Sequence, residues 1–159
     1  MQRVILFLGL VLATTVAAHA GVATAAEPVY DRQLAQRLGA DERGMRPYVL
    51  AILKTGPATG LAPEETRRLF EGHFANIQRL SDQGALVIAG PLDANPRQYR
   101  GLFILVATTR EEAEKLVSTD PAVAAGIFVV EYYPWYGSAA LMEAPAIHRR
   151  LQPPKATAQ

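Results

Sequence analysis

Cysteine is absent from this chain of 159 residues. Thiol nucleophiles, thiolate zinc sites and iron–sulfur clusters are therefore excluded, and no disulfide can stabilise the fold. Histidine is scarce, because only His73 and His148 remain beyond the first 26 residues. A metal ion needs several ligands, so we predict no metal site. With 50% hydrophobic residues, the chain can instead build the core of a single domain.

An excess of charge of one sign is also missing. The chain has 16 Lys and Arg against 15 Asp and Glu, interleaved along its length. Proteins that bind nucleic acid usually carry a basic stripe that neutralises phosphates, so we predict no nucleic-acid partner. No glycine-rich loop follows a predicted strand and opens a helix, so we predict no nucleotide and no other cofactor. A small-molecule ligand or a second copy of the chain fits this composition better.

The first 26 residues have the pattern of a secretory signal peptide. Arg3 provides the charged start, residues 4–16 the apolar core, and Ala18–Ala20 or Ala23–Ala25 the small residues before a cleavage site. The apolar run is shorter than the about 20 residues that a membrane span needs, so we expect no membrane association after cleavage. The mature protein is therefore predicted to be periplasmic or secreted.

Hydrophobic periodicity predicts the order strand, helix, strand, strand, helix, strand. We expect the strands over residues 48–53, 85–89, 102–106 and 126–133. The two helices begin at Pro63 and at a capping box of Thr108 with Glu111. This order is typical of an α+β, ferredoxin-like βαββαβ fold, in which both helices cover one face of an antiparallel sheet.

The same assignment divides the chain into four parts. They are the signal peptide (1–26), an N-terminal extension with a short helix (27–45), the α+β domain (46–143) and a mobile C-terminal tail (144–159). The predicted strands carry more apolar residues than the helices can cover, namely Val49, Ile52, Val87, Phe103, Leu105, Phe128 and Val130. Because a second subunit can cover the remaining face of the sheet, we predict a homodimer.

His73 and Asp120 are the only candidate acid–base pair in the sequence. His73 occupies a core-facing position of the long helix, and Asp120 stands before a proline at a helix end. A neutral imidazole can accept a proton near pH 7, and a carboxylate bound to its other nitrogen fixes the tautomer. The alternatives are a histidine satisfied within the core and an aspartate that forms a helix-exit turn.

Three further residues are candidates for substrate binding. Gly90 and Pro91 could bring the backbone close to a ligand, although the same pair suits a plain turn after a strand. Ser138 could donate a hydrogen bond to a ligand or simply turn the chain.

From about residue 46 to residue 143 the chain resembles the YCII-related domain family. The resemblance is carried by the first strand, Gly72-His73 with the helix to Leu80, Gly84-x-Leu86-x-x-Ala89-Gly90-Pro91, and Glu111-Glu112-Ala113 leading to Asp120-Pro121 and Gly126. It implies the ferredoxin-like fold, assembly as a dimeric α+β barrel and an active site at His73 and Asp120. It also implies lyase, isomerase or dehalogenase-like chemistry without a cofactor.

These observations lead to three hypotheses about function. The first is an exported, cofactor-free enzyme that uses His73 and Asp120 on a small cyclic or aromatic compound. The second is a non-catalytic small-ligand-binding or accessory dimer in which this pair is structural. The third is an accessory protein that docks a partner through residues 30–44, which requires an exposed apolar stripe at Leu34 and Leu38.

Overall fold

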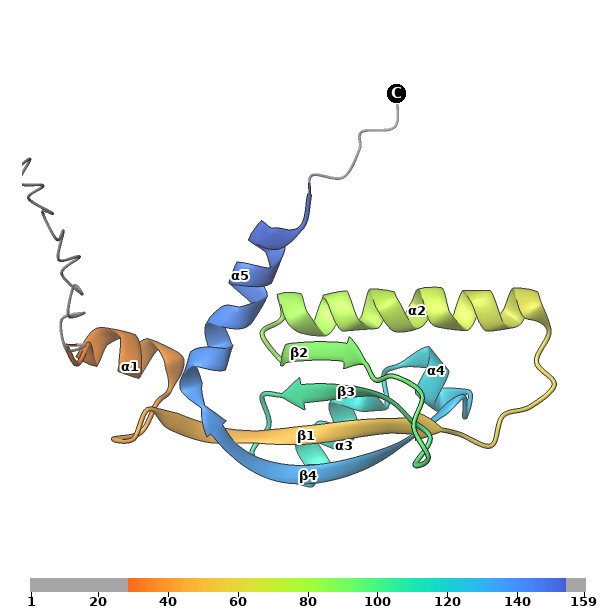
Figure 1. The fold of residues 1–159 in the computed structure, drawn as a ribbon, viewed down its shortest axis with the longest axis horizontal. Coiled ribbons are helices and arrows are strands. Elements are labelled where there is room, and N and C mark those ends of the chain that lie inside the picture. Colours follow the sequence, from red (N-terminus) through yellow and green to blue (C-terminus); the bar gives the residue numbers. More distant parts are fainter. Residues whose placement is uncertain (1–28, 154–159) are drawn as a thin grey trace, which may run out of the picture. The chain divides into compact units, whose positions relative to one another are not determined.

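The computed structural model describes residues 29–153, so the predicted signal peptide lies outside the described residues. The elements are α1 (Arg32–Leu38), β1 (Met45–Thr55), α2 (Pro63–Asp82), β2 (Leu86–Pro91), β3 (Tyr99–Leu105), α3 (Arg110–Val117), α4 (Pro121–Ala124), β4 (Phe128–Ser138), η1 (Ala139–Glu143) and α5 (Ala144–Leu151) (Figure 1). Within residues 29–153, no helix is long and apolar enough to cross a membrane.

The four strands form one antiparallel sheet in the order β2-β3-β1-β4. The central strand β1 pairs with β3 through Ala51 and Phe103, and with β4 over its whole length, from Met45 opposite Ser138 to Thr55 opposite Phe128. With α2 after β1, and α3 and α4 before β4, this is the ferredoxin-like βαββαβ arrangement. The predicted α+β fold class is therefore confirmed.

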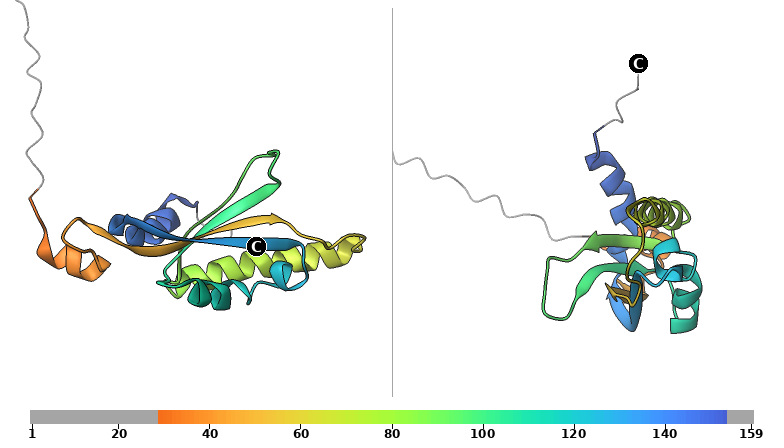
Figure 2. Two further views of the ribbon diagram at one scale, coloured as in Figure 1. Left: turned by 90° about the horizontal axis from the view of Figure 1, so that it is seen from below. Right: turned by 90° about the vertical axis from the view of Figure 1, so that its right-hand side faces the viewer.

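Helices α2, α3 and α4 all lie on one face of the sheet (Figure 2). Successive side chains along β1 point to opposite faces of the sheet, and Val49, Ala51 and Leu53 are buried on the face that the helices cover. The intervening Leu50 and Ile52 point to the opposite face and are only partly buried. The sheet therefore presents a second face that the helices leave uncovered.

The fourth strand is longer than predicted. Its pairing with β1 continues past Pro134 to Ser138, whereas the sequence pattern predicted an end at Tyr133. Because β4 is at the edge of the sheet, it needs hydrogen bonds on one side only, and a residue without an N–H group is tolerated there. Gly90 and Pro91 likewise belong to the end of β2, opposite Leu102 and Gly101, and do not form a turn.

Two other local predictions need correction. The cap of α3 is Thr109, whose side chain accepts from the backbone of Glu112, so the capping box begins one residue after the predicted Thr108. The region predicted as a C-terminal tail contains α5, a helix that the sequence pattern did not predict. This helix has Pro145 in its first turn and basic residues in its last turn, both of which favour a helix.

Candidate functional site

The structure brings His73 and Asp120 into direct contact. His73 Nδ1 lies 2.6 Å from Asp120 Oδ2, and the aspartate side chain is fully buried. The other oxygen, Oδ1, accepts from the backbone N–H of Ala122 at 2.9 Å, so Asp120 is also the N-cap of α4. An ionised carboxylate only accepts hydrogen bonds, so the ionised form of Asp120 requires the donor to be the Nδ1–H group of His73.

A glycine next to the histidine permits this contact. A Cβ atom on Gly72 would lie 2.9 Å from Cγ and 3.3 Å from Cβ of Pro121, which is the first residue of α4. These distances are shorter than ordinary contacts between carbon atoms, which are about 3.5–4.0 Å. Gly72 therefore lets α4 approach α2 closely enough for Asp120 to reach His73.

A polar cluster holds the segment before Asp120 against α2. Arg79 Nη2 donates to Asn76 Oδ1 and to Thr119 Oγ1, each at 2.7 Å. Thr119 Oγ1 also lies 3.0 Å from Asn76 Oδ1. Asn76 and Arg79 follow His73 by one and nearly two turns of α2, so this cluster fixes the partner of the histidine relative to its helix. The sequence pattern did not indicate these residues, because contacts between segments 40 residues apart leave no local signal.

Phenylalanine rings enclose the imidazole on several sides. Phe103 stacks on it at a centroid distance of 6.0 Å, and Phe70, Phe74 and Phe128 approach at 6.2, 5.4 and 5.4 Å. These four are all the phenylalanines of the described residues. Apolar walls lower the local dielectric, which strengthens the hydrogen bond between His73 and Asp120.

The second imidazole nitrogen has a different environment. Within residues 29–153, Nε2 of His73 forms no hydrogen bond. Unlike the buried polar atoms without a partner, it is not fully enclosed by the protein. The side chain as a whole remains 9% exposed. Nε2 is therefore the atom of this pair that a ligand can approach, while Nδ1 is held by Asp120.

Of the predicted substrate-binding residues, Ser138 lies far along the sheet, whereas Gly90 on β2 pairs with Leu102, next to Phe103, whose ring stacks on His73. Ser138 ends β4, ten residues after Phe128, so it lies roughly 33 Å along the strand from the ring that contacts His73. Its hydroxyl accepts from the backbone of Ala140. A Cβ atom on Gly90 would meet nothing within 4 Å, so no neighbouring atom of the chain requires glycine there. A single subunit does not bring Ser138 to His73.

The N-terminal extension is docked on the domain. Leu38 is buried, Arg37 Nη2 lies 3.1 Å from Glu143 Oε1, and Arg46 donates to the carbonyl of Leu38 at 2.8 Å. Only Leu34 of the predicted stripe is exposed, at 36%. Leu38 therefore does not contribute to an exposed apolar stripe, whereas Tyr30 of the same extension is 70% exposed.

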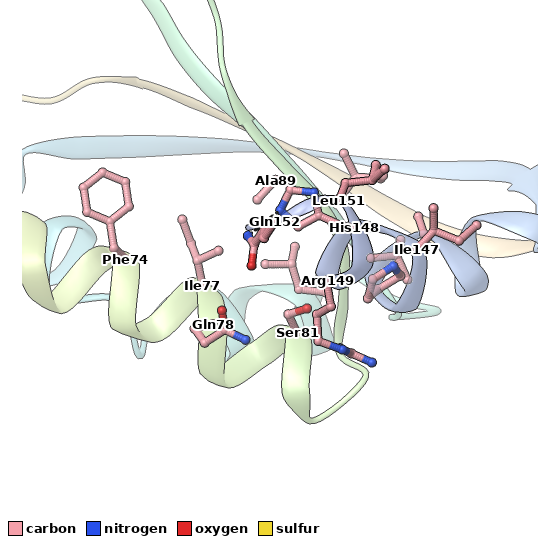
Figure 3. Close-up of a pocket in the computed structure, with 15 residues that line it drawn as sticks. Phe74, Ile77, Gln78, Ser81, Ala89, Ile147, His148, Arg149, Leu151 and Gln152 are labelled. Carbon is pink, nitrogen blue, oxygen red and sulfur yellow. Dashed lines mark hydrogen bonds between the residues drawn. The ribbon is translucent and has the colours of Figure 1, made fainter. Parts of the chain in front are cut away.

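A groove of about 500 Å³ lies between α2, the edge strand β2 and α5 (Figure 3). His73 does not line it, but Phe74, whose ring contacts the imidazole, does. The sequence pattern did not indicate this groove, because no helix or strand was predicted after residue 143. Within residues 29–153, no cluster of three His, Cys, Asp or Glu side chains could hold a metal ion.

Comparison with known proteins gives three results. The YCII-related domain matches residues 47–136, which is more than half of the chain. The structure of 5-chloro-2-hydroxyhydroquinone dehydrochlorinase from Burkholderia phenoliruptrix AC1100, in complex with 2,5-dihydroxybenzoquinone, is similar with 20% sequence identity and a TM-score of 0.40. That similarity covers 55% of this chain and 92% of the other. No curated protein sequence matches significantly.

Proposed function

Because this chain belongs to the YCII-related domain family, we propose that it is an enzyme that performs acid–base chemistry on a small molecule through His73 and Asp120. One observation carries the proposal: His73 Nδ1 is held 2.6 Å from Asp120 Oδ2 while Nε2 has no partner within the described residues. An imidazole with one fixed and one open nitrogen can act as a general base or acid.

Each residue has a distinct role in this proposal. Nε2 of His73 takes a proton from the substrate or returns one to it. Asp120 keeps the proton of the neutral imidazole on Nδ1 and stabilises the imidazolium that forms when Nε2 is protonated. The phenylalanine rings keep water from the pair and offer apolar surfaces, so the proposed substrates are cyclic or aromatic compounds. Proton transfer, elimination and isomerisation all suit this arrangement, which supplies no redox group of its own.

The test begins with the tautomer of His73. When the imidazole of His73 is neutral, its ¹⁵N NMR signals should show a protonated Nδ1 and an unprotonated Nε2. In Asp120→Asn, the signals should show that both tautomers are populated. Small cyclic and aromatic compounds are then screened for changes in the Nε2 signal. Compounds that bind are incubated in D₂O to detect exchange of carbon-bound protons.

Removing His73 should then decide whether the pair is catalytic. General acid–base groups contribute about 10²–10⁴-fold to rate, so His73→Asn should lower the rate of proton exchange by that factor. Asp120→Asn should also lower it, because the wrong tautomer blocks Nε2. Exchange at the wild-type rate in His73→Asn would contradict the proposal.

The competing function is a ligand-binding or accessory dimer in which the pair is structural. The burial of the pair favours this function, since His73 as a whole residue, backbone included, is 7% exposed and Asp120 is fully buried. In that case ligands bind without any exchange of protons, and Asp120→Asn lowers the stability of the protein but changes no reaction rate.

The proposed assembly is a homodimer that covers the free face of the sheet. Leu50 and Ile52 of β1 lie on this face, opposite Tyr133 and Glu131 of β4. Tyr133 is 47% exposed, and its burial against a second sheet would remove apolar surface from water. Sedimentation velocity should show a dimer that Tyr133→Glu converts to monomers, whereas Leu92→Glu, an exposed site in the β2–β3 loop, should leave it intact.

A charged pair on the same face is compatible with a dimer. Lys54 Nζ lies 2.7 Å from Glu131 Oε1. The hydrogen bond to Glu131 raises the pKa of Lys54, and the same bond lowers the pKa of Glu131. Each side chain therefore neutralises the other, so a facing subunit would not leave an unpaired charge buried.

Export completes the proposed function. Residues 1–26 act as a signal peptide, and the enzyme works in the periplasm or outside the cell. Expression of the full chain in a Gram-negative host, followed by cell fractionation and intact-mass measurement, tests this. A shortened chain in the periplasmic fraction supports export, and a full-length chain in the cytoplasm contradicts it.

A further inference from the structure

The groove between α2, β2 and α5 is lined by apolar side chains that are unusually exposed. Phe74, Ile147 and Leu151 keep 64%, 50% and 76% of their surface in water. Single exposed apolar residues are common, but several around one concavity mark a binding surface. Figure 3 shows Phe74 and Ile77 on α2 and Ile147 and Leu151 on α5, which together form two walls of the groove.

The dimensions of the groove suit a small organic molecule. Its volume of about 500 Å³ lies within the roughly 300–1,000 Å³ of small-molecule sites. Along α2 it extends from Phe74 to Ser81, which are two helical turns apart and so separated by about 10 Å. A ligand of two fused rings or a comparable chain can lie along this length.

The charge of the groove selects the ligand. Among the described residues, no Asp or Glu lines it, whereas Arg149 and His148 of α5 do. Within residues 29–153 Arg149 takes part in no ion pair, unlike Arg37 and Arg110, which have carboxylate partners. Both of these basic residues sit in the last turn of α5 (Figure 3). A guanidinium beside apolar walls matches a carboxylate on an apolar body.

We infer that the groove between α2, β2 and α5 is a binding site for a small apolar carboxylate, whose apolar body lies against Phe74 and Ile77 and whose carboxylate pairs with Arg149. This site does not depend on catalysis by His73, because His73 does not line the groove. Phe74 connects the two sites, since its ring also lies 5.4 Å from the imidazole of His73. A ligand in the groove therefore shifts the NMR signals of the imidazole without touching it.

Calorimetry with naphthoate and with its uncharged analogue, naphthylmethanol, tests the inference on the mature chain. Naphthoate should bind once per chain, and naphthylmethanol should bind about three- to tenfold more weakly, as expected for the loss of one partly exposed charged hydrogen bond. Arg149→Gln should weaken the binding of naphthoate by the same factor and leave the affinity for naphthylmethanol unchanged. Arg150→Gln is the matched control, because Arg150 carries the same charge on the same helix but does not line the groove.

A second variant blocks the groove without changing its charge. Ala89 lines the groove from the exposed edge strand, and Ala89→Phe should fill the space and abolish binding of both compounds. Equal effects of Arg149→Gln and Arg150→Gln, or equal affinity for both compounds, would overturn the assignment of a carboxylate site. Absence of saturable binding would overturn the site itself. If the affinity falls as the protein concentration rises, a second copy of the chain occupies the groove and the assignment is overturned. If the affinity improves in a chain that ends at Pro153, the C-terminal end of the same chain occupies it, and the assignment is likewise overturned.

Discussion

Substitution of Gly72 by alanine is a sensitive probe of the contact between α2 and α4. The new Cβ atom would lie 2.9 Å from Pro121 Cγ, so α4 must move by roughly 0.6 Å to restore an ordinary carbon contact. Overpacking of this kind costs about 1–3 kcal/mol. Alanine in a helix gains about 1 kcal/mol over glycine, so we expect a net loss of about 0–2 kcal/mol in the free energy of unfolding.

The same movement should loosen the contact between His73 and Asp120. Urea denaturation measures the change in stability, and ¹⁵N NMR of the imidazole measures the tautomer of His73. Ala75→Gly, at an exposed position of the same helix, isolates the helix propensity and should cost about 1 kcal/mol. Pro121→Ala removes Cγ, so combining it with Gly72→Ala should recover much of the lost stability, a coupling that a double-mutant cycle detects. If Gly72→Ala stabilises the protein by about 1 kcal/mol and leaves the His73 signals unchanged, the close-approach argument is refuted.

Three other predictions address the fold. Thr109→Ala should lower the free energy of unfolding by about 1 kcal/mol because it removes the cap of α3, as urea denaturation can measure. Leu80→Ala should cost about 2–5 kcal/mol in the same assay, because Leu80 is fully buried in the core. Burial raises the pKa of Tyr132 from 10.0 to about 12. Between these values the unfolded chain loses the phenolic proton while the folded protein keeps it, so stability should fall as the pH rises through this window. Tyr132→Phe should reduce that fall, measured by denaturation at several alkaline pH values, and an unchanged pH dependence would contradict the assigned cause.

The order of helices and strands could be predicted from the sequence because local chemistry determines it. Pro63 and the two acidic residues after it open α2, Gly39 in a left-handed conformation ends α1, and alternating or continuous apolar runs form the strands. Residue type alone also singled out His73, since it is one of two histidines beyond residue 26. The βαββαβ order then led to the fold class, because few topologies suit that order.

Local signals failed where long-range pairing set the outcome. Pro134 predicts the end of a strand. However, β4 continues beyond it, because an edge strand needs hydrogen-bond partners on one side only. The segment after residue 143 reads as a tail, but α5 lies beside β2 and α2 and forms the groove with them. Its helix signals, Pro145 and the basic last turn, were present but had no visible surface to pack against.

The sequence by itself determined the fold class, the lack of thiol chemistry and the identity of the candidate acid–base residues, because these follow from composition and local periodicity. Only the tertiary structure decided that His73 and Asp120 lie 2.6 Å apart, that Gly72 permits the approach, and that Ser138 is remote from them. The physical reason is that these are contacts between segments 47 or more residues apart, set by the packing of helices on a sheet and invisible to any local pattern.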